Sequence, residues 1–174
     1  MCSQRGGLVI LIGLGANLSS ARYGSPSETL GAALDLIEDR GVQILDRSRW
    51  YASAPETATV GEPKDWYTNG VAVLGTDLQA SAVLTLLMEV EHSLGRVRVV
   101  KNESRVVDLD LLAHDDLVVD QGPEFVIPHP RLHLRSFVLL PLGEVAPGWR
   151  HPKIGATVEE LIADLPRAGL ATPI

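Results

Sequence analysis

Two aspartates separated by one residue, Asp108 and Asp110, are the most informative feature of this sequence. They lie in the apolar stretch Val106–Leu112, which its composition and length predict to be a β-strand. Side chains alternate across a strand, so both carboxylates would project from one face, roughly 6–7 Å apart. Such a pair repels unless a cation lies between its members, and Mg²⁺ takes carboxylate oxygens together with water and phosphate oxygens. Two solvated carboxylates on an exposed strand are the alternative, and for an isolated Asp-x-Asp this is the more common outcome.

Basic residues precede the acidic pair in the chain. They are Arg96, Arg98, Lys101 and Arg105. Phosphoryl-type transfer needs both kinds of charge, because metal ions orient the polyphosphate while arginines stabilise charge on the group that moves. Ion pairs between these basic residues and acids such as Glu91 or Glu103 are an equally good explanation when the segment is considered alone.

A second cluster of chemically active side chains occupies Pro128–Phe137 and contains His129, Arg131, His133 and Arg135. Several cationic groups in a short loop suit an anionic ligand. Zinc is the rival, but the two histidines lack a convincing third ligand and no thiolate is near them in the sequence. A structural role for one of the histidines is the better interpretation than metal binding.

A third candidate is Asp65-Trp66-Tyr67-Thr68-Asn69, where aromatic rings stand beside an amide at a loop–strand junction. These side chains could stack on and hydrogen-bond to a flat heterocycle. Core aromatics beside an asparagine turn are the alternative. The sequence lacks a P-loop, a dinucleotide-binding glycine fingerprint after Gly13-Leu14-Gly15 and a Gly-x-Ser-x-Gly elbow.

The elements that must position these residues follow a β-α-β-β-α-β order. The predicted strands are 8–12, 42–51, 69–74 and 106–112, with a turn at 13–17 and a long loop at 52–66. The predicted helices are 25–41, started by Ser25-Pro26-Ser27-Glu28, and 77–94, with Leu78, Val83, Leu86, Leu87, Val90 and Leu94 as its apolar stripe. A hairpin at 117–127 and helical turns at 132–142 and 158–165 follow. This order predicts one α+β domain, residues 1–174, with a ferredoxin-like sandwich and a C-terminal extension.

Composition narrows the class of protein further. The 174 residues are 45% hydrophobic and carry a net charge of −7, which suits a globular domain and argues against a general nucleic-acid binder. Cys2 is the single cysteine, and no apolar run approaches the roughly 20 residues of a membrane span. We therefore expect a cytoplasmic protein that binds neither nucleic acid nor membrane and is by default a monomer.

In chain order these segments resemble the 6-hydroxymethyl-7,8-dihydropterin pyrophosphokinases of folate synthesis, from about Leu8 to Pro152. The motifs that carry the resemblance are Gly15-Ala16-Asn17-Leu18, Tyr51-x-Ser53-x-Pro55, Tyr67-x-Asn69, Glu91-x-x-x-Gly95-Arg96-x-Arg98, Arg105-x-x-Asp108-Leu109-Asp110, Pro128-His129-Pro130 and Arg135-x-Phe137. The resemblance implies transfer of a diphosphate from ATP to the pterin's hydroxymethyl group, with release of AMP.

The resemblance also implies a role for each matching residue. Asp108 and Asp110 would hold two Mg²⁺ ions. Tyr67 and Phe137 would sandwich the pterin ring, whose edge and surroundings would be formed by Gly15, Ser53, Ala54, Pro55, Glu56 and Asn69. The ATP site would comprise Glu91, Arg96, Arg98, Arg105, Leu111, His129 and Arg135. Of these, Arg96 and Arg105 would also take part in the transfer step.

Some positions depart from the family pattern. Asn102-Glu103-Ser104 precedes Arg105 where many relatives have Trp-Gly-Pro, Ser53-Ala54 replaces a common Thr-Pro, and Tyr23–Ser27 lengthens the first loop. A non-catalytic ferredoxin-like module that senses a small molecule or binds RNA is the rival from another class. An RNA-binding module would need a basic, aromatic sheet face, which an aromatic content of 5% does not favour.

Overall fold

The computed structural model describes residues 9–56, 66–95 and 106–174. Its elements are β1 (Ile10–Ala16), α1 (Pro26–Glu38), β2 (Gln43–Arg47), β3 (Tyr51–Ser53), β4 (Tyr67–Gly75), α2 (Ala80–Ser93), β5 (Asp108–His114), β6 (Val119–Asp120), β7 (Val126–Ile127), the 3₁₀ turn η1 (Leu132–Leu134), α3 (Ser136–Val145), α4 (Val158–Ala163) and β8 (Thr172–Pro173). The main sheet is antiparallel, in the order β5-β1-β4-β3-β8, and β2 also pairs with β4.

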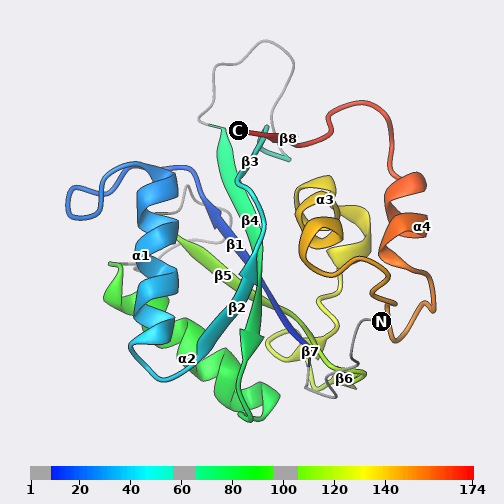
Figure 1. Ribbon diagram of the computed structural model, residues 1–174, viewed down its shortest axis with the longest axis horizontal. Helices are drawn as coiled ribbons and strands as arrows, with labels where there is room; N and C mark the ends of the chain where they lie inside the picture. Colours follow the sequence, from blue (N-terminus) through cyan, green and yellow to red (C-terminus); the bar gives the residue numbers. More distant parts are fainter. Residues whose placement is uncertain (1–8, 57–65, 96–105) are drawn as a thin grey trace, which may run out of the picture.

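A helical layer covers each face of this sheet, α1 and α2 on one side and α3 and α4 on the other (Figure 1). If β2 and β3 are counted as one interrupted strand, the order β-α-β-β-α-β and the sheet order match the predicted ferredoxin-like sandwich. The predicted C-terminal extension supplies the second helical layer, and the predicted hairpin is present as β6–β7. In the described part of the chain, no helix is both long and apolar enough to cross a membrane.

Strand β1 divides the core between the two layers. Ile10, Ile12 and Leu14 face α1 and α2 and are nearly inaccessible, whereas Leu11 packs on the α3 side. The predicted turn at 13–17 is wrong for 13–16. This segment continues the strand, because it pairs with β4 on one side and with β5 on the other.

The helices begin and end where local chemistry dictates. Ser25 caps α1 in a reciprocal arrangement with Glu28, whose carboxylate accepts from the Ser25 backbone N–H at 2.8 Å. The helix ends at Glu38, slightly before the predicted Gly41, which has a positive φ of 84°. Helix α2 starts at Ala80 rather than Asp77, so Leu78 precedes it and is 36% exposed instead of lying in the apolar stripe.

The single strand predicted at 42–51 is broken between β2 and β3. The Ser48 hydroxyl accepts from the Val71 backbone N–H at 3.0 Å and donates to the Arg49 carbonyl at 2.7 Å. The Trp50 ring covers Gly70 so closely that a Cβ there would lie 2.7 Å from it. Contacts with β4 therefore impose the break. The short strand β8, which pairs with β3, was not predicted.

Candidate active site

Polar side chains replace apolar ones along the α3 face of the sheet toward one end. Leu11, Val71 and Leu112 pack under α3 and α4 on this face. Further along, Gly15 pairs with both Asn69 and Asp108, and paired residues in adjacent strands project from the same face. The strand pairing thus brings residues from distant parts of the sequence to one polar surface.

The acidic pair lies on this surface as the sequence predicts. Asp108 and Asp110 are half-buried, while Leu109 between them is buried on the opposite face. Their partners across β1 are Gly15 and Gly13, which have no side chains to crowd the carboxylates. A Cβ at Gly15 would stand 3.4 Å from the Asn69 Oδ1.

The donor set suits a hard cation. Two carboxylates on one face of β5, opposite glycines, offer the oxygen ligands that Mg²⁺ takes together with water and phosphate oxygens. Among the described residues, no group of three or more histidine, cysteine, aspartate or glutamate side chains converges as a metal site.

Strands β3 and β4 supply the amide and one aromatic. Tyr67 pairs with Ser53, and the Asn69 Nδ2 donates to the Ser53 Oγ at 3.0 Å. Asn69 and Ser53 are each 5% exposed, and Tyr67 is half-buried. The alternative of an asparagine turn is wrong, because Asn69 lies within β4.

The buried acid on α2 supports the acidic pair from the other layer. Glu91 is 3% exposed, and its Oε1 accepts from the Leu109 backbone N–H at 2.7 Å. This bond fixes β5 midway between the two aspartates. The Leu111 side chain lies in the core against the α1–α2 layer, 6% exposed, so any contact it makes on the aspartate face is through its backbone.

The loop before α3 approaches the aspartates from the edge of β5. The His129 backbone N–H donates to the Leu112 carbonyl at 2.8 Å. Burial, followed by the charges of Arg135 and Arg131, lowers the pKa of His129 to about 4, while Asp108 and Glu56 act in the opposite direction. The imidazole is therefore neutral near pH 7, and its Nδ1 accepts from the Arg131 backbone N–H at 3.2 Å.

Arg135 joins this loop to the segment that follows β3. Its Nε and Nη2 donate to the two carboxylate oxygens of Glu56 at 3.1 and 3.3 Å. The guanidinium carbon lies 5.3 Å from the centre of the Phe137 ring, so Arg135 also contacts the second predicted aromatic. Ala54 and Pro55 connect Glu56 to β3.

Three predicted residues, Arg96, Arg98 and Arg105, lie outside the described part of the chain.

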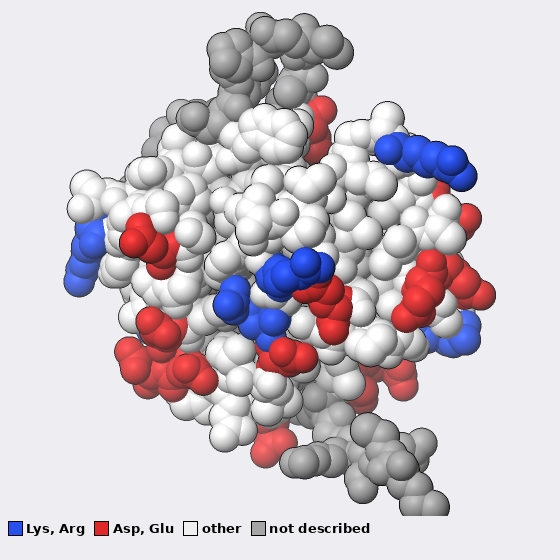
Figure 2. Space-filling view, turned by 45° about the horizontal axis from the view of Figure 1, so that its top comes forward, with Lys and Arg blue, Asp and Glu red and all other residues white. Residues whose placement is uncertain are grey.

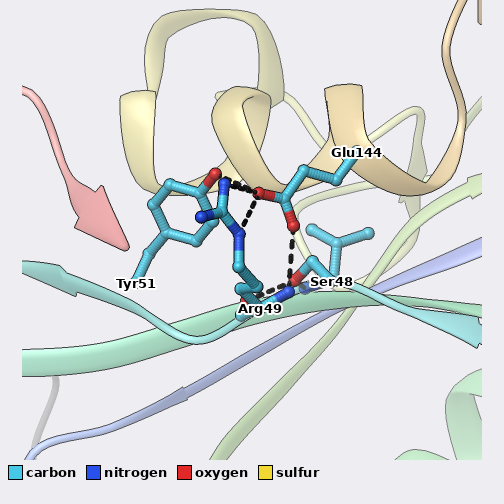
Figure 3. A network of polar contacts seen from close by, with 5 residues as sticks. Ser48, Arg49, Tyr51 and Glu144 are labelled. Carbon is cyan, nitrogen blue, oxygen red and sulfur yellow. Dashed lines mark hydrogen bonds and ion pairs between the residues drawn. The ribbon is translucent and has the colours of Figure 1, made fainter. Parts of the chain in front are cut away.

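The structure also reveals a network that the sequence did not suggest (Figure 3). The Glu144 carboxylate accepts from the Arg49 side chain and backbone and from the Tyr51 hydroxyl, tying β3 to α3. Glu144 is 93 to 95 residues from these two partners, so no local pattern could have indicated the network.

These features define a class of protein: a ferredoxin-like α+β domain with an acidic pair on one face of its sheet. The model of the 7,8-dihydro-6-hydroxymethylpterin-pyrophosphokinase (HPPK) family matches residues 11–147, and the chain belongs to this family. The resemblance predicted from the motifs is confirmed, and with it a pyrophosphokinase role in folate biosynthesis that uses ATP as co-substrate.

Individual relatives agree. The chain is 35% identical over 152 residues to the 2-amino-4-hydroxy-6-hydroxymethyldihydropteridine pyrophosphokinase of Synechocystis, covering 87% of this chain and 73% of that protein. It is 32% identical over 148 residues to the enzyme of the same name from Porphyromonas gingivalis, covering 83% and 95%. A Plasmodium falciparum HPPK-DHPS crystal structure is similar in fold, with a TM-score of 0.69 at 14% identity, over 92% of this chain and 44% of that one.

Proposed function

We propose that this chain transfers the diphosphate of ATP to the hydroxymethyl oxygen of 6-hydroxymethyl-7,8-dihydropterin in an Mg²⁺-dependent reaction that releases AMP. The observation that carries the proposal is the shared sheet face of Gly15, Asn69, Asp108 and Asp110, in a chain of the pyrophosphokinase family. A carboxylate pair suited to Mg²⁺ and an amide suited to a heterocycle share that face. Phosphoryl-type transfer to a pterin alcohol needs both.

In this proposal the pterin lies between Tyr67 and Phe137. Asn69 lies in β4 between β1 and β3, where the ring's polar atoms would be, and the segment 53–56 begins in the neighbouring strand β3. Gly15, which lies between Asn69 and Asp108, contributes no side chain of its own to this surface, and this would favour close approach by a flat ring. The stacked aromatic rings would supply most of the contact area.

Asp108 and Asp110 would hold Mg²⁺, and we expect two ions. When bound, the metal would neutralise the polyphosphate and lower the pKa of the pterin alcohol. The alcohol oxygen would attack the β-phosphorus in line, forming the new oxygen–phosphorus bond as the bond to the α-phosphate oxygen breaks and AMP departs with that oxygen. The reaction balances with release of the alcohol proton to solvent water.

Arginines would bind the nucleotide and stabilise the charge that moves during transfer. The neutral His129 is near enough to both Asp108 and Arg135 for their charges to act on it, and Arg96, Arg98 and Arg105 complete the proposed set. Glu91 would act by holding β5 in place, and Leu111 through its backbone. Basic groups lie beside acidic ones on the face seen in Figure 2, rather than forming one continuous basic surface.

The decisive experiment identifies the nucleotide product. The protein is incubated with Mg²⁺, ATP and the pterin alcohol, and AMP is separated from ADP. We expect AMP only when the pterin is present, and loss of turnover in Asp108→Asn and Asp110→Asn with unchanged circular dichroism. ADP would indicate ordinary phosphoryl transfer, and absence of both products would favour a non-catalytic binding module.

We also propose that residues 1–174 form a single domain that acts as a cytoplasmic monomer. One continuous main sheet with a helical layer on each face supports the single domain. Sedimentation velocity would test the oligomeric state. A monomer would sediment as a species of 18.7 kDa, and a dimer as a species of twice that mass.

A further inference from the structure

One carboxylate, that of Glu56, engages two arginines of the segment before α3: Arg135, which belongs to the proposed nucleotide site, and Arg131. Arg135 binds it through two parallel donors, at 3.1 and 3.3 Å, and the Arg131 Nη1 lies 3.6 Å from its Oε2. The Arg135 side chain is only 12% exposed, whereas those of Glu56 and Arg131 are 51% and 60% exposed. The acid therefore sits at the solvent side of a largely buried guanidinium.

A carboxylate and a phosphate compete for the same donors of an arginine. The planar guanidinium fork binds two oxygens of either group in the same geometry. The Nε and Nη2 of Arg135 are both committed to Glu56, and the Phe137 ring lies 5.3 Å from its guanidinium carbon. A phosphate that binds this fork in the same way must displace the Glu56 carboxylate.

The two partners belong to different substrate loops. Glu56 is three residues beyond Ser53, whose hydroxyl is hydrogen-bonded to Asn69 on the proposed pterin surface. Arg135 ends the turn η1 and immediately precedes α3, six residues beyond His129. Their ion pair thus links the segment beside the pterin to the loop that would hold the nucleotide.

We propose that Glu56 is a positioning residue that competes with the phosphates of ATP for Arg135 and Arg131. This inference rests on the proposed role of Arg135 in nucleotide binding. ATP exchanges the Glu56–Arg135 pair for a phosphate–Arg135 pair, and the exposed Glu56 carboxylate returns to water. The competition weakens ATP binding and couples nucleotide entry to release of the 53–56 segment.

The test measures the affinity of Mg²⁺ with the non-transferable analogue α,β-methylene-ATP by isothermal titration calorimetry. Glu56→Gln keeps the shape of the side chain and removes its charge, so we expect the dissociation constant to fall about two- to fivefold, the value of a partly exposed ion pair. Glu56→Asp keeps the charge on a shorter side chain and should give an intermediate affinity. Glu89→Gln, on the exposed side of α2, removes the same charge in the opposite layer and should leave the affinity unchanged.

The arginine variants separate this inference from the function on which it rests. We expect Arg135→Gln to weaken binding of the analogue. If this variant does not fold, Arg131→Gln, at a more exposed side chain, replaces it, with the same expectation. In either background Glu56→Gln should change the affinity less than it does in the unmodified protein. If the arginine variants weaken binding but Glu56→Gln weakens it or leaves it unchanged, the competition is refuted and the proposed nucleotide site stands. If neither arginine variant changes the affinity, both the nucleotide role of this loop and the competition are wrong.

Discussion

Glu144 lies outside the proposed site, and its hydrogen bonds lead us to expect that its removal lowers the free energy of unfolding more than removal of any other polar side chain there. Its Oε1 accepts from the Tyr51 hydroxyl at 2.5 Å and from the Arg49 side chain at 2.6 and 2.9 Å, and its Oε2 accepts from the Arg49 backbone N–H at 2.9 Å. Tyr51 is 5% exposed, whereas the Arg49 side chain is 65% exposed. The tyrosine bond should therefore dominate the energetics.

The magnitude follows from this difference in burial. An exposed ion pair contributes about 0–1 kcal/mol, and a hydrogen bond from a buried hydroxyl to a charged acceptor contributes about 1.5–3 kcal/mol. We expect Glu144→Ala to lower the free energy of unfolding by about 1.5–4 kcal/mol, because it loses both. Tyr51→Phe should cost about 1.5–3 kcal/mol, and Arg49→Gln, at an exposed side chain, much less.

Urea unfolding followed by circular dichroism gives these values, and a double-mutant cycle between Tyr51→Phe and Glu144→Gln isolates the bond between the two side chains. The reasoning is refuted if Arg49→Gln costs as much as Glu144→Ala, or if the cycle gives no coupling. A functional effect should accompany the loss of stability. The Tyr51 carbonyl lies 3.4 Å from the Asn69 Nδ2, so displacement of β3 should raise the KM for the pterin more than the KM for ATP.

Three further perturbations test the packing, the site surface and the charges. Gly70→Ala places a Cβ 2.7 Å from the Trp50 ring and should lower the free energy of unfolding by about 1–3 kcal/mol, measured by urea titration. Gly15→Ala places a Cβ 3.4 Å from the Asn69 Oδ1, an ordinary contact, so calorimetry should show little change in Tm but weaker binding of the pterin. Burial first, then the neighbouring arginines, lowers the pKa of His129 from 6.5 to about 4, so the unfolded chain binds a proton that the folded chain does not. The free energy of unfolding should have its full value above pH 6.5 and decrease as the pH falls toward 4. The decrease should be less than about 3 kcal/mol, because the ring is partly exposed. His129→Gln should flatten this part of the curve of unfolding free energy against pH.

Features that depend on neighbours in the sequence were predicted well. The segment Ser25-Pro26-Ser27-Glu28 predicts a helix start from four neighbouring residues, and α1 begins there, with Ser25 and Glu28 forming a reciprocal cap. The shared face of Asp108 and Asp110 follows from the alternation of any strand, and the structure has both aspartates on one face of β5. Such local rules act before any tertiary contact is formed.

Features that depend on distant residues were missed or misplaced. The break between β2 and β3 arises because Ser48 and Trp50 contact Val71 and Gly70 on β4, which nothing in 42–51 indicates. The strand at 13–16 was predicted as a turn, because glycines favour turns when they are considered alone. Pairing with β4 and β5 overrides that preference.

The same distinction explains which parts of the proposed site could be predicted. The motifs identify Glu56 and Arg135 as separate members of two substrate loops, but their ion pair spans 79 residues and depends on how β3 and α3 pack. The Glu144 network sets that packing from the side of α3, and the bond between Asn69 and Ser53 sets it from the side of β4. Residue types therefore predict the chemistry of the site. The strength of the Glu56–Arg135 ion pair in the absence of a phosphate, in contrast, depends on the folded chain. A substitution at Glu144 should consequently alter the Glu56–Arg135 pair without touching either residue.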